Sequence, residues 1–144
     1  MTTINIIALF CALVSAVAAA ISAGLTYRIA KSTKKDELQQ KLNDILKLGI
    51  QYPQFENKAF TSQWKDKQNQ EEYLRYDMYC NLIYNYLHDV YDFYDGDKSK
   101  IEDFLDVRNW VRIHEENWKN PVDKYENIDG YDKPFRDFIN NYLD

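Results

Sequence analysis

Residues 4–27 read INIIALFCALVSAVAAAISAGLTY, and this stretch decides the fold. It contains no Asp, Glu, Lys or Arg, and most of its residues are apolar. A helix of this length covers the roughly 30 Å hydrocarbon core of a bilayer with some tilt. The sequence therefore predicts a transmembrane helix over residues 1–27.

A cleaved signal peptide is the alternative for this segment, because Ala16-Val17-Ala18 has the form of a cleavage site. Two features favour an uncleaved span. No basic residue precedes the apolar run, and apolar residues continue well beyond the possible cleavage site. We therefore expect a single-pass membrane protein.

A basic collar follows the span directly and consists of Arg28, Lys31, Lys34 and Lys35. Basic residues concentrate on the cytoplasmic side of a span. The sequence thus predicts an outside N-terminus and a cytoplasmic C-terminal domain. Cys11 lies in the apolar run and Cys80 in a helical pattern, so we expect two reduced thiols, in agreement with a reducing compartment.

The span has faces of different character. Small residues recur at every fourth position and allow helix backbones to approach closely: Ala8, Ala12, Ala16, Ala20 and Gly24. A seven-residue count gives a small or polar stripe: Asn5, Ala8, Ala12, Ser15, Ala19, Ser22 and Thr26. This segregation indicates self-association, through a tight dimer seam or as the wall of a water-filled pore. An Ala-rich anchor of no further meaning is the alternative.

The chain beyond the collar is acidic. Of the 18 basic residues, 14 follow the collar, together with all 23 acidic residues, which gives a net charge of −9 from Asp36 onward. Such a domain lacks the long-range attraction to phosphate that general nucleic-acid binding requires.

Apolar spacing predicts the order of the helices. The helix of the span should continue through residues 28–48 and end at Gly49. Further helices are expected over residues 71–94, 98–118 and 134–143, with an irregular or short helical stretch over residues 52–64 and a turn at residues 95–97. The first of these helices has an apolar stripe at three- and four-residue steps: Tyr73, Tyr76, Cys80, Ile83, Leu87, Val90 and Tyr94. The expected fold is all-α, with a cytoplasmic bundle of four to five helices over residues 49–144.

Most signatures of enzymes and metal sites are absent from the sequence. The chain has four Gly and no Gly-rich phosphate loop, and its two His and two Cys form no zinc-binding pattern. The acidic residues near the expected turn lack the spacing of a calcium loop and should be solvated: Asp92, Asp95, Asp97 and Glu102. We expect no metal and no cofactor.

One string stands out, Arg108-Asn109-Trp110-Val111-Arg112-Ile113-His114. It resembles the R-N-x4-H motif of HEPN domains, small helical bundles of prokaryotic defence and toxin systems. The resemblance implies metal-independent RNA cleavage at a site shared by two copies, with Arg108 on the phosphate, Asn109 as polar support and His114 as acid/base. An ideal helix sets Arg108 and His114 roughly 120° apart. Two alternatives remain. One is a divergent HEPN-like site that does not cleave RNA, and the other is a structural role with a salt-bridged Arg108 and a core His114.

The whole layout resembles the small membrane accessory proteins of type VI-B CRISPR loci. The resemblance rests on the single span, the basic collar, the helical domain and the R-N-x4-H string. It implies a homo-oligomeric assembly of the bacterial inner membrane, such as a pore, that enhances RNA-guided antiphage defence by disturbing the membrane. The implied partners are further copies of the chain, the lipid bilayer, and a CRISPR RNA-targeting effector or RNA.

Three functions follow from these features. The first is the homo-oligomeric membrane effector, which is not an enzyme. The second is a membrane-tethered HEPN ribonuclease that uses Arg108 and His114. The third is an anchored adaptor that binds a partner protein through its helices, which are rich in Tyr (12 in the chain).

Overall fold

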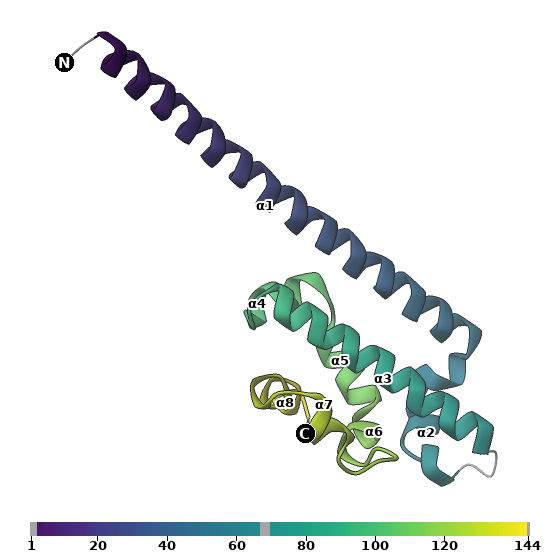
Figure 1. The fold of residues 1–144 in the computed structure, drawn as a ribbon. Coiled ribbons are helices and arrows are strands. Elements are labelled where there is room, and N and C mark those ends of the chain that lie inside the picture. Colours follow the sequence, from purple (N-terminus) through teal and green to yellow (C-terminus); the bar gives the residue numbers. More distant parts are fainter. Residues whose placement is uncertain (1–2, 67–69, 144) are drawn as a thin grey trace. The chain divides into compact units, whose positions relative to one another are not determined.

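The computed structural model describes residues 3–66 and 70–143, with the side chains of residues 10–66 and 71–143 (Figure 1). These described residues form helices joined by turns and contain no strand, which confirms the all-α prediction. The chain divides into two compact units, Met1–Glu37 and Leu38–Asp144. Helix α1 (Thr3–Gln51) contributes to both units.

The first unit is a stretch of α1 with an apolar surface. By length and composition, α1 is the one helix among the described residues that could cross a membrane. Its large apolar side chains are uncovered, with Phe10 67%, Leu13 58% and Ile21 59% exposed. Apolar surface is disfavoured in water by roughly 25 cal/mol per Å². This surface therefore favours lipid or another helix as its surroundings.

The C-terminal part of α1 belongs to the second unit, where Leu38 and Ile45 are buried in the core. The helix continues two residues beyond Gly49, so the predicted end at Gly49 is wrong. It stops before Pro53, because a proline disfavours the α conformation of the residue that precedes it. Gly49 instead permits close packing, since a Cβ there would lie 3.1 Å from the Tyr79 hydroxyl.

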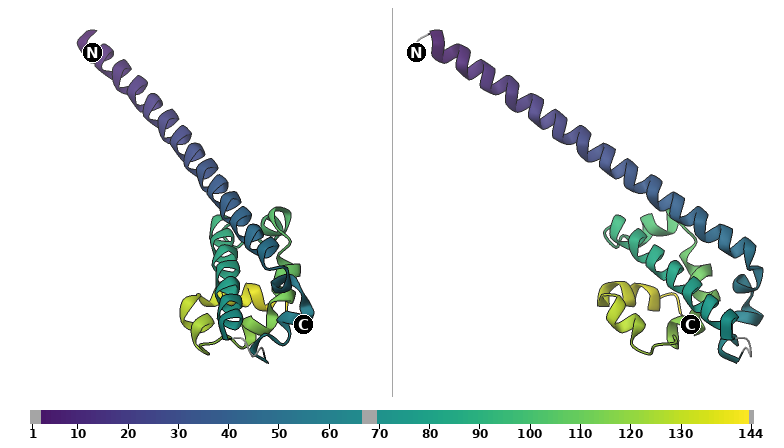
Figure 2. Two further views of the ribbon diagram at one scale, coloured as in Figure 1. Left: turned by 90° about the vertical axis from the view of Figure 1, so that its right-hand side faces the viewer. Right: turned by 45° about the vertical axis from the view of Figure 1, so that its right-hand side comes forward.

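Helix α3 (Gln70–Phe93) is the longest helix that lies wholly in the second unit, and the shorter elements pack around it (Figure 2). Five members of its predicted apolar stripe are at most 1% exposed: Tyr76, Cys80, Ile83, Leu87 and Val90. The two end members, Tyr73 and Tyr94, are partly buried. The expected short helical stretch before α3 is confirmed as η1 (Pro53–Glu56), α2 (Lys58–Thr61) and η2 (Trp64–Asp66).

The expected single helix over residues 98–118 is wrong, because three short helices take its place. These are α4 (Lys98–Phe104), α5 (Val107–Ile113) and α6 (Glu115–Lys119). Leu105 is extended (φ −152°, ψ 141°), and the Asp106 side chain then caps α5 by accepting from the Asn109 backbone N–H at 3.2 Å. His114 (φ −102°, ψ 13°) separates α5 from α6.

The chain ends in α7 (Glu126–Gly130) and α8 (Lys133–Asn140), the latter capped by Asp132. Aromatic rings join α8 to α3, with Phe135 5.6 Å from Tyr91 and 4.8 Å from His88 between ring centroids. Trp118 of α6 meets α3 through Tyr84 at 4.6 Å. Aromatic side chains thus form much of the interior of this unit.

The turn after α3 offers a test of the backbone. Gly96 has φ +71°, and a Cβ there would lie 2.9 Å from the Tyr91 hydroxyl, so Gly96→Ala should lower the free energy of unfolding by about 1–2 kcal/mol. Gly130→Ala is the matched control, because open space surrounds that position and alanine favours its helix. Thermal unfolding of the full chain in detergent measures both, and equal effects would contradict the prediction.

Candidate functional site

The predicted packing face of the span lies exposed on α1. Its described members are all exposed: Ala12, Ser15, Ala16, Ala19, Ala20, Ser22, Gly24 and Thr26. The side chains of Asn5 and Ala8 lie outside the described residues. Thr26 Oγ1 donates to the Ser22 carbonyl oxygen at 2.9 Å, which satisfies that hydroxyl proton within the helix. A partner helix could therefore approach without leaving this proton unpaired.

The basic collar is also exposed along α1, at Arg28, Lys31, Lys34 and Lys35. Lys34 Nζ lies 3.7 Å from Glu37 Oε2, and both side chains are about half exposed. A surface ion pair of this kind contributes little to stability. The collar therefore presents its positive charge to the surroundings.

The R-N-x4-H residues face different surroundings in the second unit. Arg108 and Asn109 are exposed on α5, and Arg108 lines a shallow hollow with Glu102 and Leu105. His114 follows the last residue of α5 and is fully buried (0% exposed). Within one chain, Arg108 thus lies on the surface and His114 lies in the core.

His114 lies at the centre of a buried polar network. Its Nδ1 is 2.9 Å from the Tyr76 hydroxyl and 3.7 Å from Cys80 Sγ. Its Nε2 is 3.6 Å from Glu56 Oε1, which is beyond hydrogen-bond range, and this nitrogen has no hydrogen-bond partner among the described residues. Tyr76 and Cys80 are also fully buried, so Glu56 is the member that reaches solvent.

The same junction satisfies the carbonyl groups at the end of α5. Three side chains from other elements donate to three consecutive carbonyl oxygens. Lys58 Nζ reaches Arg112 O at 2.6 Å, Thr61 Oγ1 reaches Ile113 O at 2.7 Å, and the Tyr84 hydroxyl reaches His114 O at 3.0 Å. The last carbonyls of a helix lack partners inside the helix, so Lys58 and Thr61 supply donors to the end of α5. The His114 carbonyl lies beyond α5 and also accepts from the backbone N–H groups of α6.

The acidic members of the network have pKa values shifted in opposite directions. Burial alone would raise the pKa of Glu56, but the contacts with His114 and Tyr79 outweigh it and hold the pKa below its ordinary value. The Tyr79 hydroxyl donates to Glu56 Oε1 at 2.5 Å. Burial raises the pKa of the Cys80 thiol well above its ordinary value, so Cys80 stays protonated and is a poor nucleophile despite the nearby imidazole.

This arrangement positions helices, since an enclosed imidazole has no space beside it for a substrate. Catalysis by Arg108, Asn109 and His114 stays a prediction. Sequence patterns did not reveal Glu56 as a neighbour of His114 or Thr61 as a donor to the Ile113 carbonyl oxygen, because both lie in short helices without periodic spacing. By contrast, Tyr76 and Cys80 are recognisable from the sequence as core residues, because they share the buried stripe of α3 with Ile83. Among the described residues, no group of three or more His, Cys, Asp or Glu side chains could hold a metal ion.

Comparisons with known protein families, curated proteins and solved structures found no match to this chain.

The structural role of His114 predicts different effects for the two ends of the motif. His114→Ala removes a buried ring and leaves the Tyr76 hydroxyl without its partner, so the free energy of unfolding should fall by about 2–4 kcal/mol. The exposed Arg108→Ala should change it by less than about 0.5 kcal/mol. Denaturant unfolding of the full chain in detergent, followed by near-UV circular dichroism, distinguishes them. Equal stabilities of both variants and the wild type would refute this role.

Glu56 predicts a loss of stability in acid. Its pKa in the folded chain lies below the ordinary value of 4.5, so its contribution is present above about pH 4.5 and is lost as the pH falls through the lower, folded-state pKa. Between about pH 6 and pH 3 the wild type should lose more stability than Glu56→Gln. Glu37→Gln, at an exposed position, should follow the wild type. A Glu56→Gln chain that follows the wild-type pH curve would contradict this assignment.

Proposed function

We propose that this chain is a homo-oligomeric, single-pass effector of the bacterial inner membrane, in which the span serves as both anchor and assembly surface. The observation that carries the proposal is the uncovered apolar surface of α1. Val14, Val17 and Leu25 are 52%, 59% and 54% exposed, in a window of which no part is buried. A water-soluble single helix would carry a polar face instead.

The division of the span into two faces supports self-association. Lipid tails solvate leucine as well as another helix does, so helices associate in a bilayer where small residues allow close backbone contact. The exposed positions Ala12, Ala16 and Ala20 repeat every four residues and meet this condition. Phe10, Leu13 and Ile21 would then face lipid.

The second unit carries an apolar surface of its own, which supports the same proposal. Leu74, Met78 and Leu82 follow one another at four-residue spacing on α3 and are 43%, 68% and 47% exposed. Met78 and Leu82 border a hollow of about 140 Å³ together with Tyr52 and Phe55. Exposed apolar and aromatic side chains of this kind are typical of subunit contacts.

A pore is the form of assembly that the polar stripe favours. In a ring of spans, Ser15, Ser22 and Thr26 would supply hydroxyl oxygens along an inner path without placing a charge in the bilayer. The collar would lie at the cytoplasmic mouth, in accordance with the positive-inside rule.

The proposed biological role of this effector is in RNA-guided antiphage defence. It rests on the R-N-x4-H string and on the order of span, collar and helical domain. The burial of His114 favours a HEPN-like fold that organises the oligomer over one that cleaves RNA. The effector is therefore preferred to the membrane-tethered ribonuclease, and the two different faces of the span favour it over the plain adaptor.

The oligomer can be tested by mass. The full chain purified in detergent should have the mass of several 17.2 kDa subunits. Ala12→Leu, Ala16→Leu and Ala20→Leu together should dissociate it, because the added side chains separate the helix backbones. Membrane depolarisation in cells that express the chain should be lost in the same variant.

The matched control places leucine on the opposite face, as Val14→Leu, Val17→Leu and Ile21→Leu. These changes keep a surface suited to lipid and should leave both the mass and the depolarisation unchanged. A monomeric wild type would contradict the proposal. So would a variant with leucine at positions 12, 16 and 20 that keeps the mass of the wild-type oligomer.

A further inference from the structure

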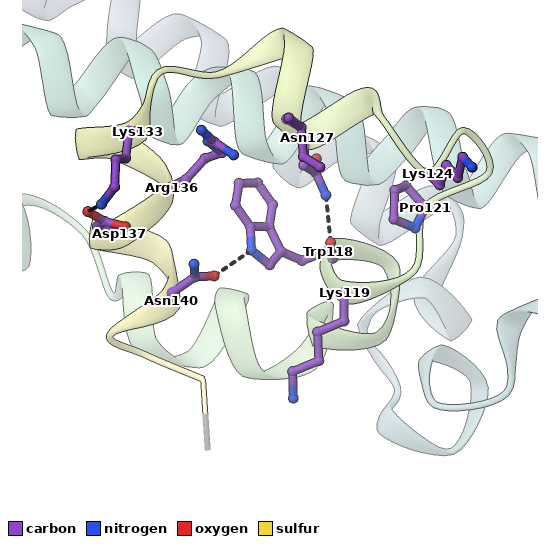
Figure 3. Close-up of a pocket in the computed structure, with 10 residues that line it drawn as sticks. Trp118, Lys119, Pro121, Lys124, Asn127, Lys133, Arg136, Asp137 and Asn140 are labelled. Atoms are coloured by element: carbon purple, nitrogen blue, oxygen red, sulfur yellow. Dashed lines mark hydrogen bonds and ion pairs between the residues drawn. The ribbon is translucent and has the colours of Figure 1, made fainter.

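A pocket of about 370 Å³ lies on the second unit and is lined by residues of α6, the loop after it, α7 and α8 (Figure 3). This volume is within the range of small-molecule sites. Its charged lining residues are four cations and one carboxylate: Lys119, Lys124, Lys133, Arg136 and Asp137. The pocket is thus cationic in a part of the chain whose net charge from Asp36 onward is −9.

Arg136 is the group that points to a ligand. It is partly buried, and its Nε atom is buried without a hydrogen-bond partner. No hydrogen bond or ion pair of its guanidinium group occurs among the described residues. Two of the other three cations differ, since Lys133 pairs with Asp137 and Lys119 with Glu115. An arginine without a carboxylate, in an acidic domain, is available to bind an anion.

The wall of the pocket is held in place before any ligand binds. Trp118 is 6% exposed, and its indole Nε1 donates to Asn140 Oδ1 at 2.9 Å. Asn127 Nδ2 donates to the Trp118 carbonyl oxygen at 2.6 Å. Figure 3 shows Arg136, Asn127 and Asn140 arranged around the indole ring.

The polar groups of the pocket are mostly donors. Because Asn140 Oδ1 accepts from Trp118, its amide nitrogen is left as a donor. The Arg136 guanidinium and the ammonium groups of Lys124 and Lys133 add further donors, all positively charged. A guanidinium group binds two oxygens of a phosphate at once, whereas lysines act as surrounding point charges.

We propose that this pocket binds a phosphate group, with Arg136 as the bidentate contact and Lys124 and Lys133 as supporting charges. The phosphate belongs to a soluble phosphorylated compound or to the head group of an anionic lipid. The pocket exceeds a single phosphate in size, so the rest of the ligand lies against Trp118 and Ile128. The site goes beyond the proposed oligomer and does not depend on it.

Calorimetric titration of the full chain in detergent tests the site, with sodium pyrophosphate as the probe at constant ionic strength. The wild type should show saturable binding, and Arg136→Gln should weaken it at least tenfold. Arg136→Lys should be intermediate, because it keeps the charge and loses the bidentate geometry. Lys47→Gln, which makes the same change of charge at an exposed position on α1, should bind as the wild type does.

A second arm identifies the source of the phosphate. Dihexanoyl phosphatidylglycerol that displaces pyrophosphate, where dihexanoyl phosphatidylcholine does not, supports a lipid head group. Pyrophosphate binding that neither lipid affects supports a soluble ligand. The proposal is overturned if the wild type fails to bind both pyrophosphate and phosphatidylglycerol, or if Arg136→Gln binds as tightly as the wild type.

A second variant guards against a folding defect of Arg136→Gln. Lys124→Gln and Lys133→Gln together alter two exposed side chains that line the pocket. This double variant should keep the near-UV circular dichroism of the wild type and bind pyrophosphate several-fold more weakly. Unchanged binding by the double variant would also count against the site.

Discussion

The second unit depends on how the chain closes the junction between α5 and α6. The last carbonyl oxygens of a helix lack partners within it, and those that are buried must find a donor elsewhere. Here Lys58, Thr61 and Tyr84 donate to three consecutive carbonyl oxygens. His114 adds its ring to the same point, beside Tyr76. The junction therefore fixes the segment before α3, α3 itself and α5–α6 against one another, and the aromatic core forms around it.

The two units solve the problem of apolar surface in opposite ways. The helical unit covers most of its large apolar groups internally, apart from the exposed row of Leu74, Met78 and Leu82. Several phenols pack their rings while their hydroxyls find polar partners, as Tyr131 does with Asn85 at 3.0 Å. The span has no such cover, and the small size of its residues at Ala12, Ala16 and Ala20 leaves a smooth surface. Stability in the first case comes from the chain itself, and in the second from whatever surrounds it.

Sequence patterns predicted the long elements well and the short ones poorly. The stripe of α3 repeats over many turns, so Tyr76, Ile83 and Val90 were recognisable as core positions. The break at Leu105 carries no Gly or Pro, and Asp106 was its one local signal, as a helix cap. The surroundings of His114 could not be predicted. Its neighbour Glu56, and Thr61, which donates to the adjacent Ile113 carbonyl oxygen, are more than fifty residues away along the chain and lie in helices too short to show a period.

The hydrogen bond from Thr26 to the Ser22 carbonyl bears on how such a helix enters a bilayer. A threonine whose proton is shared with its own backbone carries little extra desolvation cost into hydrocarbon, so no partner needs to be present when the helix inserts. Under the proposed function, insertion and assembly would then be separate events. Single helices would collect in the membrane first, and their local concentration would decide when they meet.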